Sequence, residues 1–146
     1  MKRIMILSTT LLMFAFTKAQ VREIPQEVKD AFTHQYPEAT DVDYKDQLVK
    51  VNVHFTLNGE NYIATYNNKG AWKGSEKEWT FEKLSDMVKD GFSKSKYADW
   101  ETTEVAVLYI PGGTEQYRIL VKKNDLQKKY LFFNTKGRLL WEAITI

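Results

Sequence analysis

Strict alternation of apolar and polar residues over one short segment constrains this chain most. From Val49 to Phe55 every second residue is apolar, and polar residues stand between them. A period of two is that of a β-strand with one face on a core and the other in water. Asn58-Gly59 follows, and this dipeptide favours a two-residue type I′ turn because both residues tolerate positive φ. The pattern predicts a hairpin in which Phe55 pairs with Tyr62.

The hairpin assigns the neighbouring side chains to faces. If its pairing continues, Ile63 and Lys50 point to the outer, wet face of the sheet. A further turn follows Tyr66. If that turn places Ala71 opposite Tyr66, Trp72 also lies on the outer face, close to Ile63 and Lys50. Trp72 is therefore a candidate aromatic anchor for a partner, with packing into a core as the open alternative.

Two segments carry helical rather than strand periodicity. Between Pro25 and Tyr36 the apolar residues recur at three- and four-residue spacing, Pro25 suits a first helical turn, and Pro37 ends the segment. A second amphipathic stretch runs from about Phe81 to Lys96. We expect one helix over each segment.

The two predicted helices resemble each other in sequence, which suggests an internal repeat. Residues 28–32 read VKDAF and residues 88–92 read VKDGF, and the turn NNKG at 67–70 reappears as NTKG at 134–137. Such self-similarity is typical of duplicated units. The predicted fold class is α+β, a tandem duplication of a helix plus four-stranded antiparallel meander, with unit one at about 24–79 and unit two at about 80–146.

The first residues have the layout of a secretory signal peptide. Lys2 and Arg3 precede an apolar run, and small residues end it at Ala19. We expect residues 1–19 to be removed and residues 20–146 to form one periplasmic or secreted domain that inserts into no membrane. Without the three basic residues of the signal, 18 basic residues face 19 acidic ones. With charges so nearly balanced, we expect no nucleic acid as a partner.

Several landmarks are similar to those of the PepSY-like family. They are Ile24-Pro25, Val28, Ala31-Phe32 and Tyr36-Pro37, followed by alternating strands and the Asn-x-Lys-Gly turn that leads to Trp72. That family is also described as resembling the β-lactamase inhibitory protein. The resemblance implies a periplasmic or secreted protein with helix-plus-sheet units, a concave sheet surface and no established enzymatic activity. The inhibitory protein has disulfides and this chain has no cysteine, so β-lactamase inhibition is not carried over.

No motif in the sequence indicates catalysis, a metal or a cofactor. The chain has two histidines, on dissimilar segments, and no cysteine that could complete a zinc site with them. Residues 41–46 place carboxylates like the start of a calcium loop, but Lys45 stands where an oxygen ligand is needed. A G-x-S-x-G nucleophile motif is also lacking. We expect no enzyme, no metal and no cofactor.

The predicted second unit is apolar on both faces of its sheet. We expect Leu131 and Phe133 on its outer face, where they would meet the first unit or a partner. The favoured function is an exported, non-catalytic binding module that recognises a protein or peptide of the cell envelope through an open sheet face. The predicted contact residues are Trp72, Ile63, Lys50, Leu131 and Phe133. The alternative is a periplasmic carrier of a small molecule or envelope component held between the sheets.

Overall fold

A computed structural model describes residues 22–145 of the chain. The predicted signal peptide lies outside these residues. The elements follow one another along the chain in the order α1 (Gln26–Gln35), β1 (Thr40–Asp46), β2 (Lys50–Leu57), β3 (Glu60–Asn67), β4 (Trp72–Trp79), α2 (Asp86–Ser93), β5 (Glu101–Ile110), β6 (Thr114–Asn124), β7 (Gln127–Asn134) and β8 (Leu139–Ile144).

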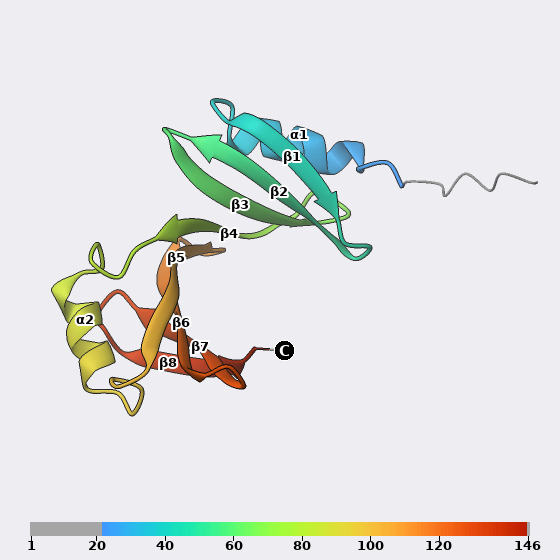
Figure 1. The fold of residues 1–146 in the computed structure, drawn as a ribbon. Helices are drawn as coiled ribbons and strands as arrows, with labels where there is room; N and C mark the ends of the chain where they lie inside the picture. The colour runs from blue at the N-terminus through green and yellow to red at the C-terminus, as the bar shows by residue number, and fades with distance from the viewer. Residues whose placement is uncertain (1–21, 146) are drawn as a thin grey trace, which may run out of the picture.

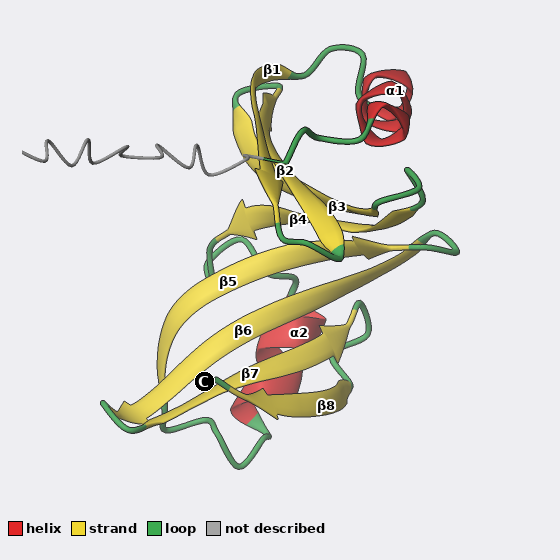
Figure 2. Ribbon diagram, turned by 90° about the vertical axis from the view of Figure 1, so that its right-hand side faces the viewer, coloured by secondary structure: helices red, strands yellow, loops and turns green. Residues whose placement is uncertain are grey.

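The eight strands in this part of the chain belong to one antiparallel sheet, in the order of the sequence (Figure 2). The predicted fold class is therefore wrong: the chain is not a tandem pair of helix-plus-meander units. Strand β4 pairs with β5 across the expected boundary, from Ser75 opposite Tyr109 to Trp79 opposite Val105. A lone meander would leave the backbone groups of its edge strand unpaired, and this pairing satisfies them. Local patterns carry no information on such an edge-to-edge contact.

Both helices pack on the same face of the sheet, α1 beside the first strands and α2 beside the last (Figure 1). Cross-strand pairing places one continuous row of side chains on this face, from β2 to β7. The row consists of Phe55, Tyr62, Lys77, Val107, Tyr117 and Phe133. Helix α1 covers one buried cluster with Val28 and Phe32. Helix α2 covers a second with Val88 and Phe92. Within residues 22–145, no helix covers the opposite face of the sheet.

The hairpin predicted at Asn58-Gly59 is confirmed. Asn58 and Gly59 have φ of 53° and 78°, as a type I′ turn requires, and Phe55 lies opposite Tyr62. Helix α2, in contrast, is shorter than predicted. It begins only after Ser85, whose hydroxyl accepts a hydrogen bond from the Val88 N–H, so the residues from Phe81 onward form turns instead.

Trp72 lies on the helix-covered face, so its predicted place on the outer face is wrong. The Asn67 N–H donates to the Ala71 carbonyl at 2.9 Å, which puts Trp72 rather than Ala71 opposite Tyr66. The Trp72 side chain packs against the first buried cluster, and its indole N–H donates to the Ser75 hydroxyl at 2.8 Å. The error arises from one residue in the turn, since a shift by one reverses the face of every side chain.

Leu131 and Phe133 are also core residues and not outer-face residues. Both side chains are fully buried in the cluster under α2. Their neighbours Tyr130 and Phe132 take the opposite face. Residues 130–133 are all apolar or aromatic, and such a run has no alternation from which its faces can be assigned.

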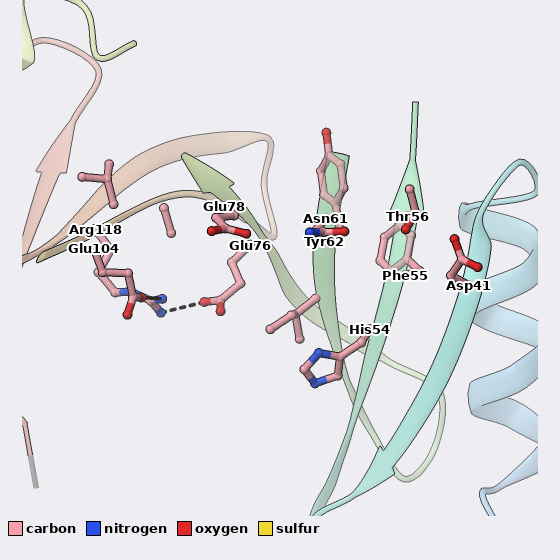
Figure 3. Close-up of a pocket in the computed structure, with 13 residues that line it drawn as sticks. Asp41, His54, Phe55, Thr56, Asn61, Tyr62, Glu76, Glu78, Glu104 and Arg118 are labelled. Atoms are coloured by element: carbon pink, nitrogen blue, oxygen red, sulfur yellow. Dashed lines mark hydrogen bonds and ion pairs between the residues drawn. The ribbon is translucent and has the colours of Figure 1, made fainter. Parts of the chain in front are cut away.

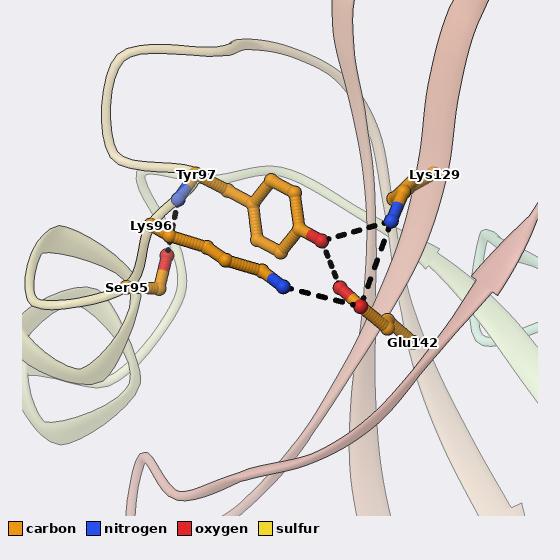
Figure 4. Close-up of polar contacts among 5 residues, drawn as sticks. All are labelled: Ser95, Lys96, Tyr97, Lys129 and Glu142. Atoms are coloured by element: carbon orange, nitrogen blue, oxygen red, sulfur yellow. Dashed lines mark hydrogen bonds and ion pairs between the residues drawn. The ribbon is translucent and has the colours of Figure 1, made fainter.

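A polar cluster ties the segment after α2 to the last two strands (Figure 4). The Tyr97 hydroxyl donates to the Glu142 carboxylate and accepts a hydrogen bond from the Lys129 ammonium at 3.1 Å. The ammonium groups of Lys96 and Lys129 lie 3.3 and 3.5 Å from the same carboxylate. The hydrogen bond from Tyr97, with the two lysines, lowers the pKa of Glu142.

The lowered pKa of Glu142 predicts a loss of stability in acid. A carboxyl group with a depressed folded-state pKa stabilises the fold above its unfolded pKa, and this contribution disappears as the pH falls through the folded value. Glu142→Gln should therefore lose less stability than the natural protein between about pH 7 and about pH 3. Urea unfolding at both pH values measures the difference. Equal losses in the two proteins would show that the cluster contributes nothing.

No helix within residues 22–145 is both long and apolar enough to cross a membrane.

Candidate binding face

The uncovered face of the sheet, here called the open face, is the candidate functional surface. Side chains from β2 to β8 contribute to it, among them Lys50, His54, Ile63, Glu76, Leu108, Arg118, Phe132 and Trp141. The sheet bends strongly across its width (Figure 1). A hollow on this face is lined by residues as far apart as Asp41 on β1 and Arg118 on β6. The open face is therefore the inside of the bend.

Two adjoining hollows occupy the open face. Hollow one is lined from β1 to β6 and has a volume of about 540 Å³. Hollow two lies toward Lys50 and Trp141 and is of similar size, about 540 Å³. Ile63, Glu76 and Arg118 line both. The two hollows therefore meet at these three side chains.

Arg118 is held in place by a pair of carboxylates (Figure 3). Its guanidinium donates to Glu76 at 2.6 Å and to Glu104 at 2.8 Å, and it lies 5.0 Å from the centroid of the Tyr130 ring. The side chain is only 19% exposed. Burial opposes its charge, but the two carboxylates outweigh burial and raise the pKa of Arg118. Arg118 is thus a permanent, fixed cation in the floor of both hollows.

The two hollows differ in charge. Hollow one is lined by four carboxylates and by the guanidinium of Arg118. The carboxylates are those of Asp41, Glu76, Glu78 and Glu104. Around hollow two stand Lys50, Lys73 and Arg118 against the one carboxylate of Glu76. The open face therefore carries an acidic end and a basic end, with the Arg118–Glu76 ion pair between them.

A stacked aromatic pair borders hollow two. The rings of Phe132 and Trp141 lie 3.6 Å apart between centroids and within 6° of parallel. Phe132 is 8% exposed, whereas Trp141 is 51% exposed although it is one of the largest side chains of the sheet. The stack limits the rotamers of Trp141, so a partner could bury the indole at a small entropic cost.

The structure brings together two of the five predicted contact residues. Ile63 and Lys50 lie on the open face and line hollow two. Trp72, Leu131 and Phe133 are on the helix-covered face, where a partner docked on the open face would not touch them. Whether Ile63 and Lys50 contact a partner stays a prediction.

Sequence reasoning missed Phe132, Trp141 and the Arg118 ion pairs. Phe132 is hidden in a run of apolar residues, and Trp141 follows a bulge, since Phe132 pairs with Trp141 but Phe133 pairs with Leu139. The alternation of polar Gln116 and Arg118 with apolar Tyr117 and Ile119 on β6 was the available signal for the face of Arg118. Within residues 22–145, no three His, Cys, Asp or Glu side chains gather closely enough to hold a metal ion.

The chain was compared with known proteins by sequence and by structure. No family model matches it, and no curated protein matches it. Its fold is similar to a solved DUF2874 family protein from Bacteroides ovatus, with 24% identity, coverage of 84% of this chain and 89% of that one, and a TM-score of 0.77. A BLIP-like protein from Bacteroides fragilis is 23% identical over 86% of this chain and 89% of that one, also with a TM-score of 0.77.

A third solved structure is a Bacteroides eggerthii protein proposed to be periplasmic. It is 22% identical, over 84% of this chain and 90% of that one, with a TM-score of 0.74. At these identities the likeness shows the fold alone. The chain therefore has a BLIP-like fold, which the resemblance to the β-lactamase inhibitory protein anticipated, while the PepSY-like family finds no support in these comparisons.

Proposed function

We propose that this protein is an exported, non-catalytic binding protein of the periplasm, and that its open face binds a protein or peptide partner. The observation that carries the proposal is the exposed Trp141, stacked on Phe132 beside hollow two. Exposed aromatic residues that are held rigidly are common anchors of protein interfaces. Ile63 and Lys50 supply an apolar and a charged contact next to this anchor.

Two observations support a location in the periplasm and a role without catalysis. The similar protein from Bacteroides eggerthii is itself proposed to be periplasmic. On the open face, the partly buried cation Arg118 is already paired with Glu76 and Glu104, so it serves to organise the surface rather than to activate a nucleophile. The similar Bacteroides fragilis protein is described as BLIP-like, which is compatible with a binding role, but this description names no binding target.

The alternative, a carrier that holds a small molecule between two sheets, loses its basis. Residues 22–145 form a single sheet, so no second sheet encloses a ligand against the first. Both hollows are depressions in an uncovered face, and Figure 3 shows the side chains that line hollow one. Small-molecule sites usually surround most of the ligand surface, and an uncovered face does not.

Trp141→Ala tests the proposal. The variant should fold with a loss of about 1 kcal/mol or less, because the side chain is half exposed, yet it should lose the partners that the natural protein captures from envelope extract. Met87→Ala is the matched control, since Met87 is 60% exposed on α2, on the other side of the sheet. Equal capture by the natural protein and Trp141→Ala would overturn the proposal.

A further inference from the structure

The charges of the open face indicate what kind of partner it binds, because the acidic and basic side chains lie at opposite ends of the strands. Lys50 at the start of β2 lines hollow two, and Thr56 near the end of the same strand lines hollow one. Six residues of extended chain span about 20 Å. An extended segment of about six to eight residues therefore reaches from one hollow to the other.

Some of the charged groups at each end are free to meet a ligand. Within residues 22–145, Glu78 and Asp41 beside hollow one and Lys50 and Lys73 beside hollow two form no ion pair with another side chain. The four residues are exposed. Glu76 and Glu104, in contrast, are occupied by Arg118. Unpaired charges of opposite sign thus stand at the two ends of one continuous surface.

We propose that the open face binds an extended polypeptide segment of dipolar charge, with Lys or Arg in hollow one and Asp or Glu in hollow two. This inference rests on the proposed function and specifies its partner. Ile63 and the Arg118–Glu76 pair lie under the middle of the segment, and Trp141 packs against its acidic half. Complementary charges set specificity and register more than affinity, since like charges brought together cost several kcal/mol.

Glu76 and Arg118 are not the recognising charges in this arrangement. They are partly buried and neutralise each other, so their exchange would disturb the surface itself. The exposed Glu78 and Lys50 recognise the ligand, one in each hollow. Each end of the segment can therefore be tested by a substitution that leaves the fold intact.

The test is selection of random eight-residue displayed peptides on the whole exported chain, starting at Gln20. With the natural protein, enriched peptides should carry Lys or Arg toward one end and Asp or Glu toward the other. Glu78→Lys should lower the enrichment of the basic residue, and Lys50→Glu that of the acidic residue, each about tenfold. The controls Glu82→Lys and Lys69→Glu make the same charge changes in exposed turns off the open face, and they should leave the selection unchanged.

The outcomes separate the two proposals. Peptides that require Trp141 but show no charge separation, or that ignore Glu78→Lys and Lys50→Glu, would overturn the dipolar segment and leave the binding face in place. Peptides enriched equally by Trp141→Ala, or no enrichment at all, would overturn both. Loss of only the basic preference in Glu78→Lys and only the acidic preference in Lys50→Glu is the result that supports the inference.

Discussion

Phe32→Ala should destabilise the protein by about 3–5 kcal/mol, the usual cost of a lost phenylalanine and the cavity that it leaves. Phe32 is 3% exposed and fills the space between α1 and the first strands. Its ring lies 5.0 Å from Phe55 and 5.8 Å from Tyr44 between centroids, in edge-to-face geometry. Such contacts add to the area that the ring buries. The free energy of unfolding of a small domain is about 5–15 kcal/mol in total, so this loss is a large share of it.

Urea denaturation followed by circular dichroism measures this effect. The control is Leu126→Ala, because Leu126 is 96% exposed in the turn between β6 and β7 and should change stability by no more than about 0.5 kcal/mol. A cost below about 1 kcal/mol for Phe32→Ala would mean that α1 does not pack on the sheet as described.

Gly137→Ala should cost about 3 kcal/mol, through a strained backbone and a steric clash together. Gly137 has a φ of +79°, and a Cβ there would run into the backbone carbonyl of Met87 and lie 3.3 Å from the Val88 nitrogen. The turn between β7 and β8 thus touches the backbone of α2 directly. Relief of the clash would require moving α2 away from the sheet, and with it Val88 and Phe92 out of the core.

Gly59→Ala separates the two costs. Gly59 has nearly the same φ, +78°, but a Cβ there meets nothing within 4 Å. This variant should carry only the backbone penalty, about 1–2 kcal/mol. The difference between the variants in free energy of unfolding then reports the clash with α2. Equal costs at the two glycines would show that the turn and α2 are not in contact.

Much of the local structure could be predicted because its causes lie within a few residues. Asn58-Gly59 sets a turn that few other sequences adopt, and the register from Phe55 opposite Tyr62 follows from it. Helix α1 begins after Pro25, whose missing N–H costs nothing at the start of a helix. It ends before Pro37, because a proline disfavours helical geometry in the residue that precedes it.

The candidate site was predicted only in part, for reasons that lie in pairing between strands. Ile63 and Lys50 follow from the first hairpin and are on the open face. Trp72 does not, because a difference of one residue in the turn reverses its face. Trp141 and Phe132 form the exposed aromatic pair instead, after a bulge between β7 and β8 that no local pattern announces.

The sequence by itself determined the hairpin at Asn58-Gly59, the bounds of α1 and the presence of a second helical segment. Only the tertiary structure decided that β4 pairs with β5 to make one eight-stranded sheet. It also decided that Arg118 joins Glu76 and Glu104, residues 42 and 14 positions away in sequence, under both hollows. Turns and caps depend on neighbouring residues, whereas edge pairing and ion pairs between strands depend on which surfaces remain unsatisfied once all the elements have formed.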